Sequence, residues 1–160
     1  MKIIIFTEGT ILMHKNGKGL PREEIVKQVE DKEPSVKDYS SYIPTGNASE
    51  KVRKWKNDGA TIIYLTSRKE LKEIEIIRGV LKRYDFPDCN LDFCRKGESY
   101  ADVAERIMPD ILIEDNCESI GGEAEMTYTN IKNELKAKIK SVVIKEFSGI
   151  DDLSDKVSML

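Results

Sequence analysis

The sequence alternates short apolar runs with longer amphipathic stretches, and this alternation restricts the fold more than any other feature. Apolar runs occupy residues 2–6, 60–65, 110–113 and 141–144, and a weaker run occupies residues 91–94. Uninterrupted runs of this length are typical of strands that are buried on both faces. Because helical stretches separate them, the pattern predicts an α/β protein with a three-layer, Rossmann-like architecture and a mostly parallel central sheet.

Apolar side chains spaced three and four residues apart predict the helices between these strands. A further helix is expected to begin near Pro21, since Glu23 and Glu24 follow it at favourable positions. Asn47 and Glu50 have the spacing of a capping box at the start of another helix. The apolar stripes are Val52 and Trp55; Leu71, Ile74, Ile77, Leu81 and Tyr84; Tyr100, Val103, Ala104 and Ile107; and Tyr128, Ile131, Leu135 and Ile139.

The length of 160 residues suits one domain with its own core. We assign residues 1–150 to this domain and expect the least regular segment, 14–47, to form a small lid. Residues 151–160 show little pattern, and we expect this C-terminal tail to fray.

The composition excludes several classes of protein. Apolar residues make up 39% of the chain, which argues against disorder. The net charge of −3 gives no general attraction to nucleic acids or acidic membranes, and no apolar stretch is long enough to cross a bilayer. Without a signal-peptide pattern, we expect a cytoplasmic protein. Cys89, Cys94 and Cys117 then fit reduced thiols better than a zinc site, because His14 is the only histidine.

Polar side chains follow the predicted strands, where the carboxyl ends of parallel strands should gather them at one edge. Glu8 follows the first strand, Thr66 and Arg68 follow the second, and Lys96 follows the weak one. Taken singly, such residues are commonly structural; Thr66, for example, could cap a helix beginning near Lys69. Together, hydroxyls, cations and carboxylates suit a phosphate ester with Mg²⁺. The acids that follow the strand at 110–113 are Glu114, Asp115 and Glu118.

The order of these pieces resembles the haloacid dehalogenase superfamily. That family has a first strand ending in Asp-x-Asp-Gly-Thr, then a strand ending in Thr or Ser, then a lysine, then paired acids. The counterparts here are Phe6-Thr7-Glu8-Gly9-Thr10, Thr66, Lys96 and Glu114-Asp115. The resemblance runs from Met1 to about Ile144 and implies a haloacid dehalogenase-like fold of the phosphatase type, with a small or absent cap. Such a cap leaves the site open, which suits a phosphorylated small molecule or macromolecule.

Carried over residue by residue, the resemblance gives each position a role. Thr66 and Lys96 would bind a phosphoryl group, although Arg95 competes with Lys96 for the lysine position. Glu8 would take the acid/base position. Mg²⁺ would be held by Asp115 with Glu114 or Glu118, and by Glu8. We also expect Arg68 to bind phosphate as a second cation, and this expectation rests only on its position after the second strand.

The sequence departs from the family at the nucleophile, because Phe6 stands where the family has its attacking aspartate. A phenyl ring can neither attack phosphorus nor bind a metal. In a register shifted by two residues, Glu8 itself becomes the nucleophile. We therefore expect a non-catalytic ligand-binding or regulatory protein. The alternatives are an atypical Mg²⁺-dependent phosphohydrolase that uses Glu8 or metal-bound water, and an interaction module with a vestigial pocket.

Overall fold

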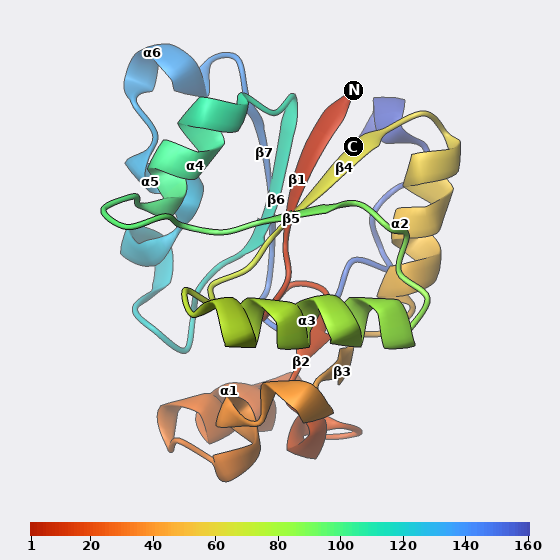
Figure 1. The fold of residues 1–160 in the computed structure, drawn as a ribbon, viewed down its shortest axis with the longest axis vertical. Coiled ribbons are helices and arrows are strands. Elements are labelled where there is room, and N and C mark those ends of the chain that lie inside the picture. Colours follow the sequence, from red (N-terminus) through yellow and green to blue (C-terminus); the bar gives the residue numbers. More distant parts are fainter.

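A parallel sheet of five strands forms the centre of the computed structural model, which describes all 160 residues (Figure 1). The strand order is β5-β4-β1-β6-β7, and every neighbouring pair is parallel. The predicted three-layer α/β architecture is therefore confirmed. The strands are β1 (Lys2–Phe6), β4 (Thr61–Leu65), β5 (Asn90–Asp92), β6 (Ile111–Asp115) and β7 (Lys140–Ile144).

Strand β1 lies in the middle of the sheet and separates two apolar cores. Ile3 and Ile5 point into the larger core, and Ile4 points into the smaller one, as the alternation of side chains along a strand requires. Helices α2 (Ala48–Asn57) and α3 (Leu71–Arg83) supply the larger core. The other face is covered by α4 (Tyr100–Ile107), α5 (Thr127–Asn130) and α6 (Asn133–Lys136), so helices flank the sheet on both sides (Figure 1).

The single helix expected through Tyr128 and Ile139 is wrong, since two short helices replace it. Ile131 is extended between them, with φ −69° and ψ 144°. One long-range and one local hydrogen bond stabilise this break: the Lys132 amide donates to the Glu105 carboxylate, and the Asn130 side chain donates back to the Met126 carbonyl. Ile131 and Ile139 are still buried in the smaller core, so the apolar pattern predicted their burial but not the helix.

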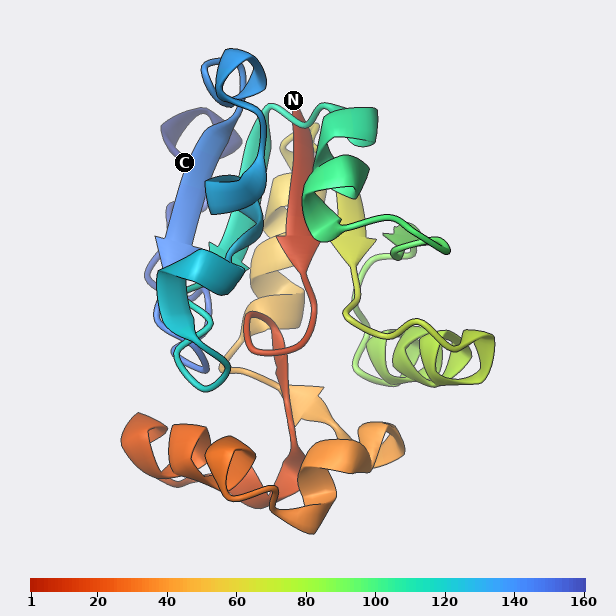
Figure 2. The same ribbon diagram turned by 90° about the vertical axis from the view of Figure 1, so that its left-hand side faces the viewer.

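Residues 14–42 form a small insertion below the carboxyl ends of the strands (Figure 2). A two-stranded antiparallel ribbon, β2 (Leu12–Met13) with β3 (Ile43–Pro44), carries it. Its one α-helix, α1 (Arg22–Glu30), begins after Pro21 as predicted. The insertion also contains three short 3₁₀ helices, Lys15–Gly17, Pro34–Lys37 and Tyr39–Ser41. Two more lie outside it, Gly122–Glu125 and Val157–Met159.

The C-terminal segment 151–160 is packed against α2, and the expectation that it frays is wrong. Val157 and Leu160 are buried in the larger core. Trp55 Nε1 donates to the Ser154 carbonyl at 2.8 Å, and Lys51 Nζ donates to the Leu153 carbonyl at 2.6 Å. Few apolar side chains suffice here because these polar contacts fix the segment.

The same segment explains why the predicted capping box does not form. Asn47 precedes α2, but its side chain makes no capping bond. Instead the Asn47 backbone amide and side-chain amide both donate to the Asp151 carboxylate. A carboxylate from the far end of the chain thus takes the place expected of a local cap.

None of the helices combines the length and apolar character needed to span a membrane. Cys89, Cys94 and Cys117 form no disulfide with one another.

The packing of the C-terminal segment can be tested by truncating one side chain. We predict that Val157→Ala lowers the free energy of unfolding by about 2 kcal/mol, because it removes buried methyl groups and leaves a cavity. The matched control is Met159→Ala, whose side chain is 70% exposed and whose loss should change the free energy by less than about 0.5 kcal/mol. Denaturant unfolding measures both; equal, negligible effects would mean that the segment is loose.

Candidate active-site cavity

A cavity of about 420 Å³ lies between the carboxyl ends of the strands and the insertion. Phe6, Glu8, Arg68 and Asp115 line it from β1, β4 and β6, and Tyr39 lines it from the insertion. The insertion also contributes Val29, Val36 and Tyr42 to the lining. The small insertion therefore encloses one side of the cavity.

Glu8 is the most heavily bonded side chain of the site. Thr66 Oγ1 donates to Glu8 Oε1 at 2.6 Å, and the Ser67 amide donates to Oε2 at 3.1 Å. Thr7 Oγ1 also lies 2.5 Å from Oε2. The side chain is only 12% exposed, so these donors take over the role that water plays at the surface. Glu8 and Thr66 meet, as the edge of the sheet predicted.

Arg68 connects the site to the insertion. Its guanidinium lies 4.3 Å from the centre of the Tyr39 ring, donates to the Tyr39 hydroxyl, and donates to Ser67 Oγ at 2.8 Å. Nε lies 3.5 Å from Glu8 Oε1, which makes an ion pair but not a well-aligned hydrogen bond. The result is a cation held rigidly beside the Glu8 carboxylate, with one buried donor that has no hydrogen-bond partner.

Thr66 does not cap a helix near Lys69, since α3 begins only at Leu71. Its hydroxyl instead accepts the Arg68 amide at 3.1 Å while donating to Glu8. The hydroxyl is thereby oriented toward the carboxylate.

Phe6 presents an apolar surface where the family resemblance expects a nucleophile. Its ring packs edge-on against Tyr100, with the ring centres 5.4 Å apart and the planes at 79°. Burial raises the pKa of Tyr100 to about 12, so that hydroxyl stays protonated and donates to the Ser67 carbonyl. Neither ring offers a group that could attack phosphorus.

Asp115 faces the same cavity from the end of β6. It accepts a hydrogen bond from Thr10 Oγ1 at 3.0 Å and one from the Cys117 amide at 2.9 Å. Burial raises its pKa above the ordinary value, and the nearby Glu8 charge raises it further. Gly9 lets the chain pass this carboxylate, because a side chain there would meet Asp115 Oδ2 at 2.6 Å.

Of the other predicted site residues, Glu114 also lines the cavity, whereas Glu118, Lys96 and Arg95 do not. Glu114 accepts the amides of Thr127 and Tyr128 at the start of α5. Glu118 pairs with Arg22 at 2.6 Å on the exposed edge of the insertion. Lys96, like Arg95, is exposed in the loop after β5 and does not line the cavity.

These positions do not fit the expected Mg²⁺ site. Of the predicted ligands, Glu8, Glu114 and Asp115 line the cavity, but each already accepts hydrogen bonds from the protein, and Glu8 is also paired with Arg68. No group of three or more His, Cys, Asp or Glu side chains is placed to hold a metal ion. The prediction that Glu8, Glu114, Asp115 and Glu118 bind Mg²⁺ together is therefore not supported by their geometry.

Sequence reasoning missed Glu146, which lines the cavity from just beyond β7. Its carboxylate accepts the Ser119 amide and hydroxyl, each at 2.7 Å, and burial raises its pKa. Ligands bind beyond the carboxyl ends of parallel strands, and applying this rule to β7 would have identified Glu146 from the sequence. Phe147, which packs edge-on against His14, also lines the cavity and was missed for the same reason.

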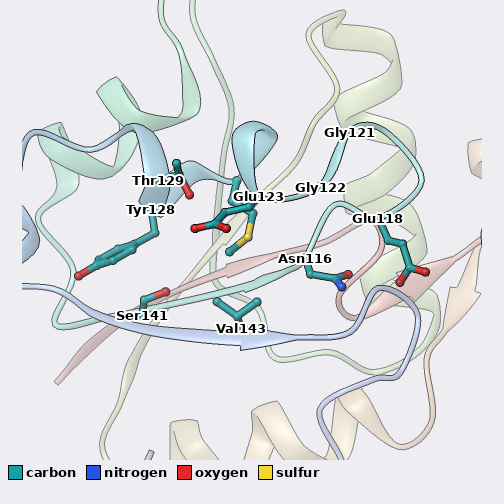
Figure 3. A pocket seen from close by; sticks show the side chains of 10 residues that line it. Asn116, Glu118, Gly121, Gly122, Glu123, Tyr128, Thr129, Ser141 and Val143 are labelled. Atoms are coloured by element: carbon teal, nitrogen blue, oxygen red, sulfur yellow. The ribbon is translucent and has the colours of Figure 1, made fainter.

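A second depression lies outside this cavity, beside β7 and the loop after β6 (Figure 3). Ser141, Val143, Tyr128 and Glu123 point into it. No lysine or arginine lines it, so it offers no cation to pair with a phosphoryl group. The cavity at the carboxyl ends of β1, β4 and β6 is therefore the better candidate.

Comparisons with known proteins leave the family open. No protein-family model matches the sequence, and no curated protein matches it significantly. Among solved structures, the D,D-heptose 1,7-bisphosphate phosphatase of Burkholderia thailandensis matches with a TM-score of 0.46 and 8% identity, over 92% of this chain and 93% of that one. A universal stress protein in complex with cAMP matches with a TM-score of 0.38 and 13% identity, over 91% and 95%. Likenesses this distant add nothing to what the chain's own geometry shows.

The close passage of Gly9 can be tested directly. We predict that Gly9→Ala lowers the free energy of unfolding by about 3 kcal/mol, since it adds a collision with Asp115 to the strain of a positive φ. Gly97→Ala is the matched control: its φ of +86° resembles the +83° of Gly9, but nothing lies within 4 Å of an added Cβ. The control substitution should lower the free energy of unfolding by only about 1 kcal/mol. Equal losses in thermal and denaturant unfolding would refute the contact.

The buried Glu146 predicts a pH-dependent difference in stability. Because burial raises its pKa in the folded state, the folded chain binds this proton more tightly than the unfolded chain. The associated stabilisation is present below the ordinary value of 4.5 and is lost as the pH rises through the folded pKa. Glu146→Gln removes this titration, so the natural chain should lose stability relative to the variant as the pH rises above the ordinary value of 4.5. Urea unfolding at pH values below and above 4.5 measures the difference in the free energy of unfolding between the two chains. A difference that does not change with pH would contradict the raised pKa of Glu146.

Proposed function

We propose that this chain is a haloacid dehalogenase-like protein that binds a small phosphorylated molecule in the cavity without turning it over. The observation that carries the proposal is Phe6, which fills the nucleophile position with a ring packed on Tyr100. The cavity is retained around it, with hydroxyl, amide and guanidinium donors beside the ring.

The size and lining of the cavity support a small ligand rather than a macromolecule. A volume of about 420 Å³ falls within the range of small-molecule sites. Nearly half of its lining residues are apolar, among them Phe6, Tyr39, Tyr42 and Tyr100. Rings of this kind suit the organic part of a ligand, while Arg68 suits its anionic group.

The alternative, an atypical phosphohydrolase, has less support. A nucleophilic Glu8 would need a carboxylate oxygen free to attack, and both of its oxygens already accept hydrogen bonds. Cys117 also lines the cavity, but burial raises the pKa of its thiol to about 12, which keeps it protonated and unreactive. The metal-bound water of the alternative would need ligands that these carboxylates do not supply together.

A panel of phosphate monoesters and nucleotides tests the proposal. We predict that at least one raises the melting temperature of the natural chain, while none releases inorganic phosphate above background, with or without added Mg²⁺. The matched control is Glu8→Gln purified in the same way, which should give the same background. Phosphate release by the natural chain that Glu8→Gln abolishes would instead establish an active enzyme.

A further inference from the structure

We propose that the Glu8 carboxylate is a built-in occupant of an anion site, which a ligand's phosphoryl group can enter only by displacing it. The inference deepens the proposed function and rests on it for the nature of the ligand. Thr66 and Arg68 were expected to contact phosphate, and they contact Glu8 instead. The carboxylate therefore occupies the position expected of the phosphoryl group when no ligand is bound.

The groups around Glu8 are those that typically bind phosphoryl oxygens. They are a hydroxyl from Thr66, the backbone amide of Ser67, a hydroxyl from Thr7 and the guanidinium of Arg68. An ionised carboxylate only accepts hydrogen bonds, so it satisfies the same donors as a phosphate oxygen would. Thr66 is fully buried, and its hydroxyl is further oriented by the Arg68 amide.

The site also has more donor capacity than Glu8 uses. Arg68 Nε is buried and has no hydrogen-bond partner, although it lies only 3.5 Å from Glu8 Oε1. The rest of the guanidinium is fixed by Tyr39 and Ser67 and cannot turn without losing these contacts. A buried donor without a partner is costly. A tetrahedral anion presents more oxygens than a carboxylate, so it could satisfy Nε as well.

Two consequences follow for binding. In the natural chain, an incoming phosphoryl group must break the Glu8 hydrogen bonds and overcome the repulsion of its charge, so inorganic phosphate alone binds weakly. When the Glu8 side chain is removed, the same donors are left buried and unpaired. Inorganic phosphate should then bind at least about tenfold more tightly, the equivalent of one charge-assisted hydrogen bond regained.

Titration with inorganic phosphate, followed by calorimetry and ³¹P NMR, tests this on three chains. Glu8→Ala should bind phosphate at least about tenfold more tightly than the natural chain. Glu125→Ala is the matched control for charge, because Glu125 lines the same cavity without contacting these donors; it should gain far less. Adding Thr66→Val to Glu8→Ala should abolish the gain, since it removes the central hydroxyl donor.

Equal phosphate affinity in Glu8→Ala and the natural chain would overturn the self-occupied site, and so would an equal gain in Glu125→Ala. Thermal unfolding establishes that each variant is folded, and Glu8→Ser replaces Glu8→Ala if the alanine variant does not fold. The two proposals fail separately. Phosphate binding by Glu8→Ala, with no phosphorylated ligand for the natural chain, would support the self-occupied site and sink the proposed function.

Discussion

Strand β1 is covered on both faces, and this constraint shapes the site. Ile3, Ile4 and Ile5 have no exposed surface and separate two apolar cores, so no charged side chain can follow Lys2 before the strand ends. The first charge after it, at Glu8, emerges at the edge of the sheet while still largely buried. A buried carboxylate needs donors, and those at hand are Thr66 and the Ser67 amide at the end of β4. The central strand thus leads directly to the hydrogen-bonded group at the centre of the cavity.

The same constraint connects the insertion to the site. Arg68 follows directly on the donors that hold Glu8, and it reaches across to Tyr39 in the insertion. A cation that contacts a carboxylate on one side and an aromatic ring on the other holds two parts of the chain together. The cavity is therefore formed by contacts that also determine its charge, and Phe6 gives its floor an apolar character in place of a nucleophile.

Much of the fold could be predicted from the sequence because burial on both faces leaves a simple pattern. The run at residues 2–6 became β1 without change, and the stripe from Leu71 to Leu81 became α3. The failures share one cause, since long-range polar contacts override local patterns. Glu105 accepts the Lys132 amide at the break between α5 and α6, and Asp151 replaces the expected cap at Asn47. Neither partner can be found from neighbouring residues.

The site was predictable to the same degree. The rule that ligands bind at the carboxyl ends of strands points to the edge of the sheet where Glu8, Arg68 and Asp115 line the cavity, with Thr66 bonded to Glu8. It could not give the direction of each side chain. Glu114 turned to the start of α5 and Glu118 to Arg22.

The most direct test of the self-occupied anion site is a crystal structure of the natural chain grown in phosphate. The account predicts the Glu8 carboxylate bonded to Thr66 Oγ1 and the Ser67 amide, with no phosphate between them. Glu8 turned away from those donors with no phosphate in its place, or a phosphate bound to them beside an undisplaced Glu8, would contradict it.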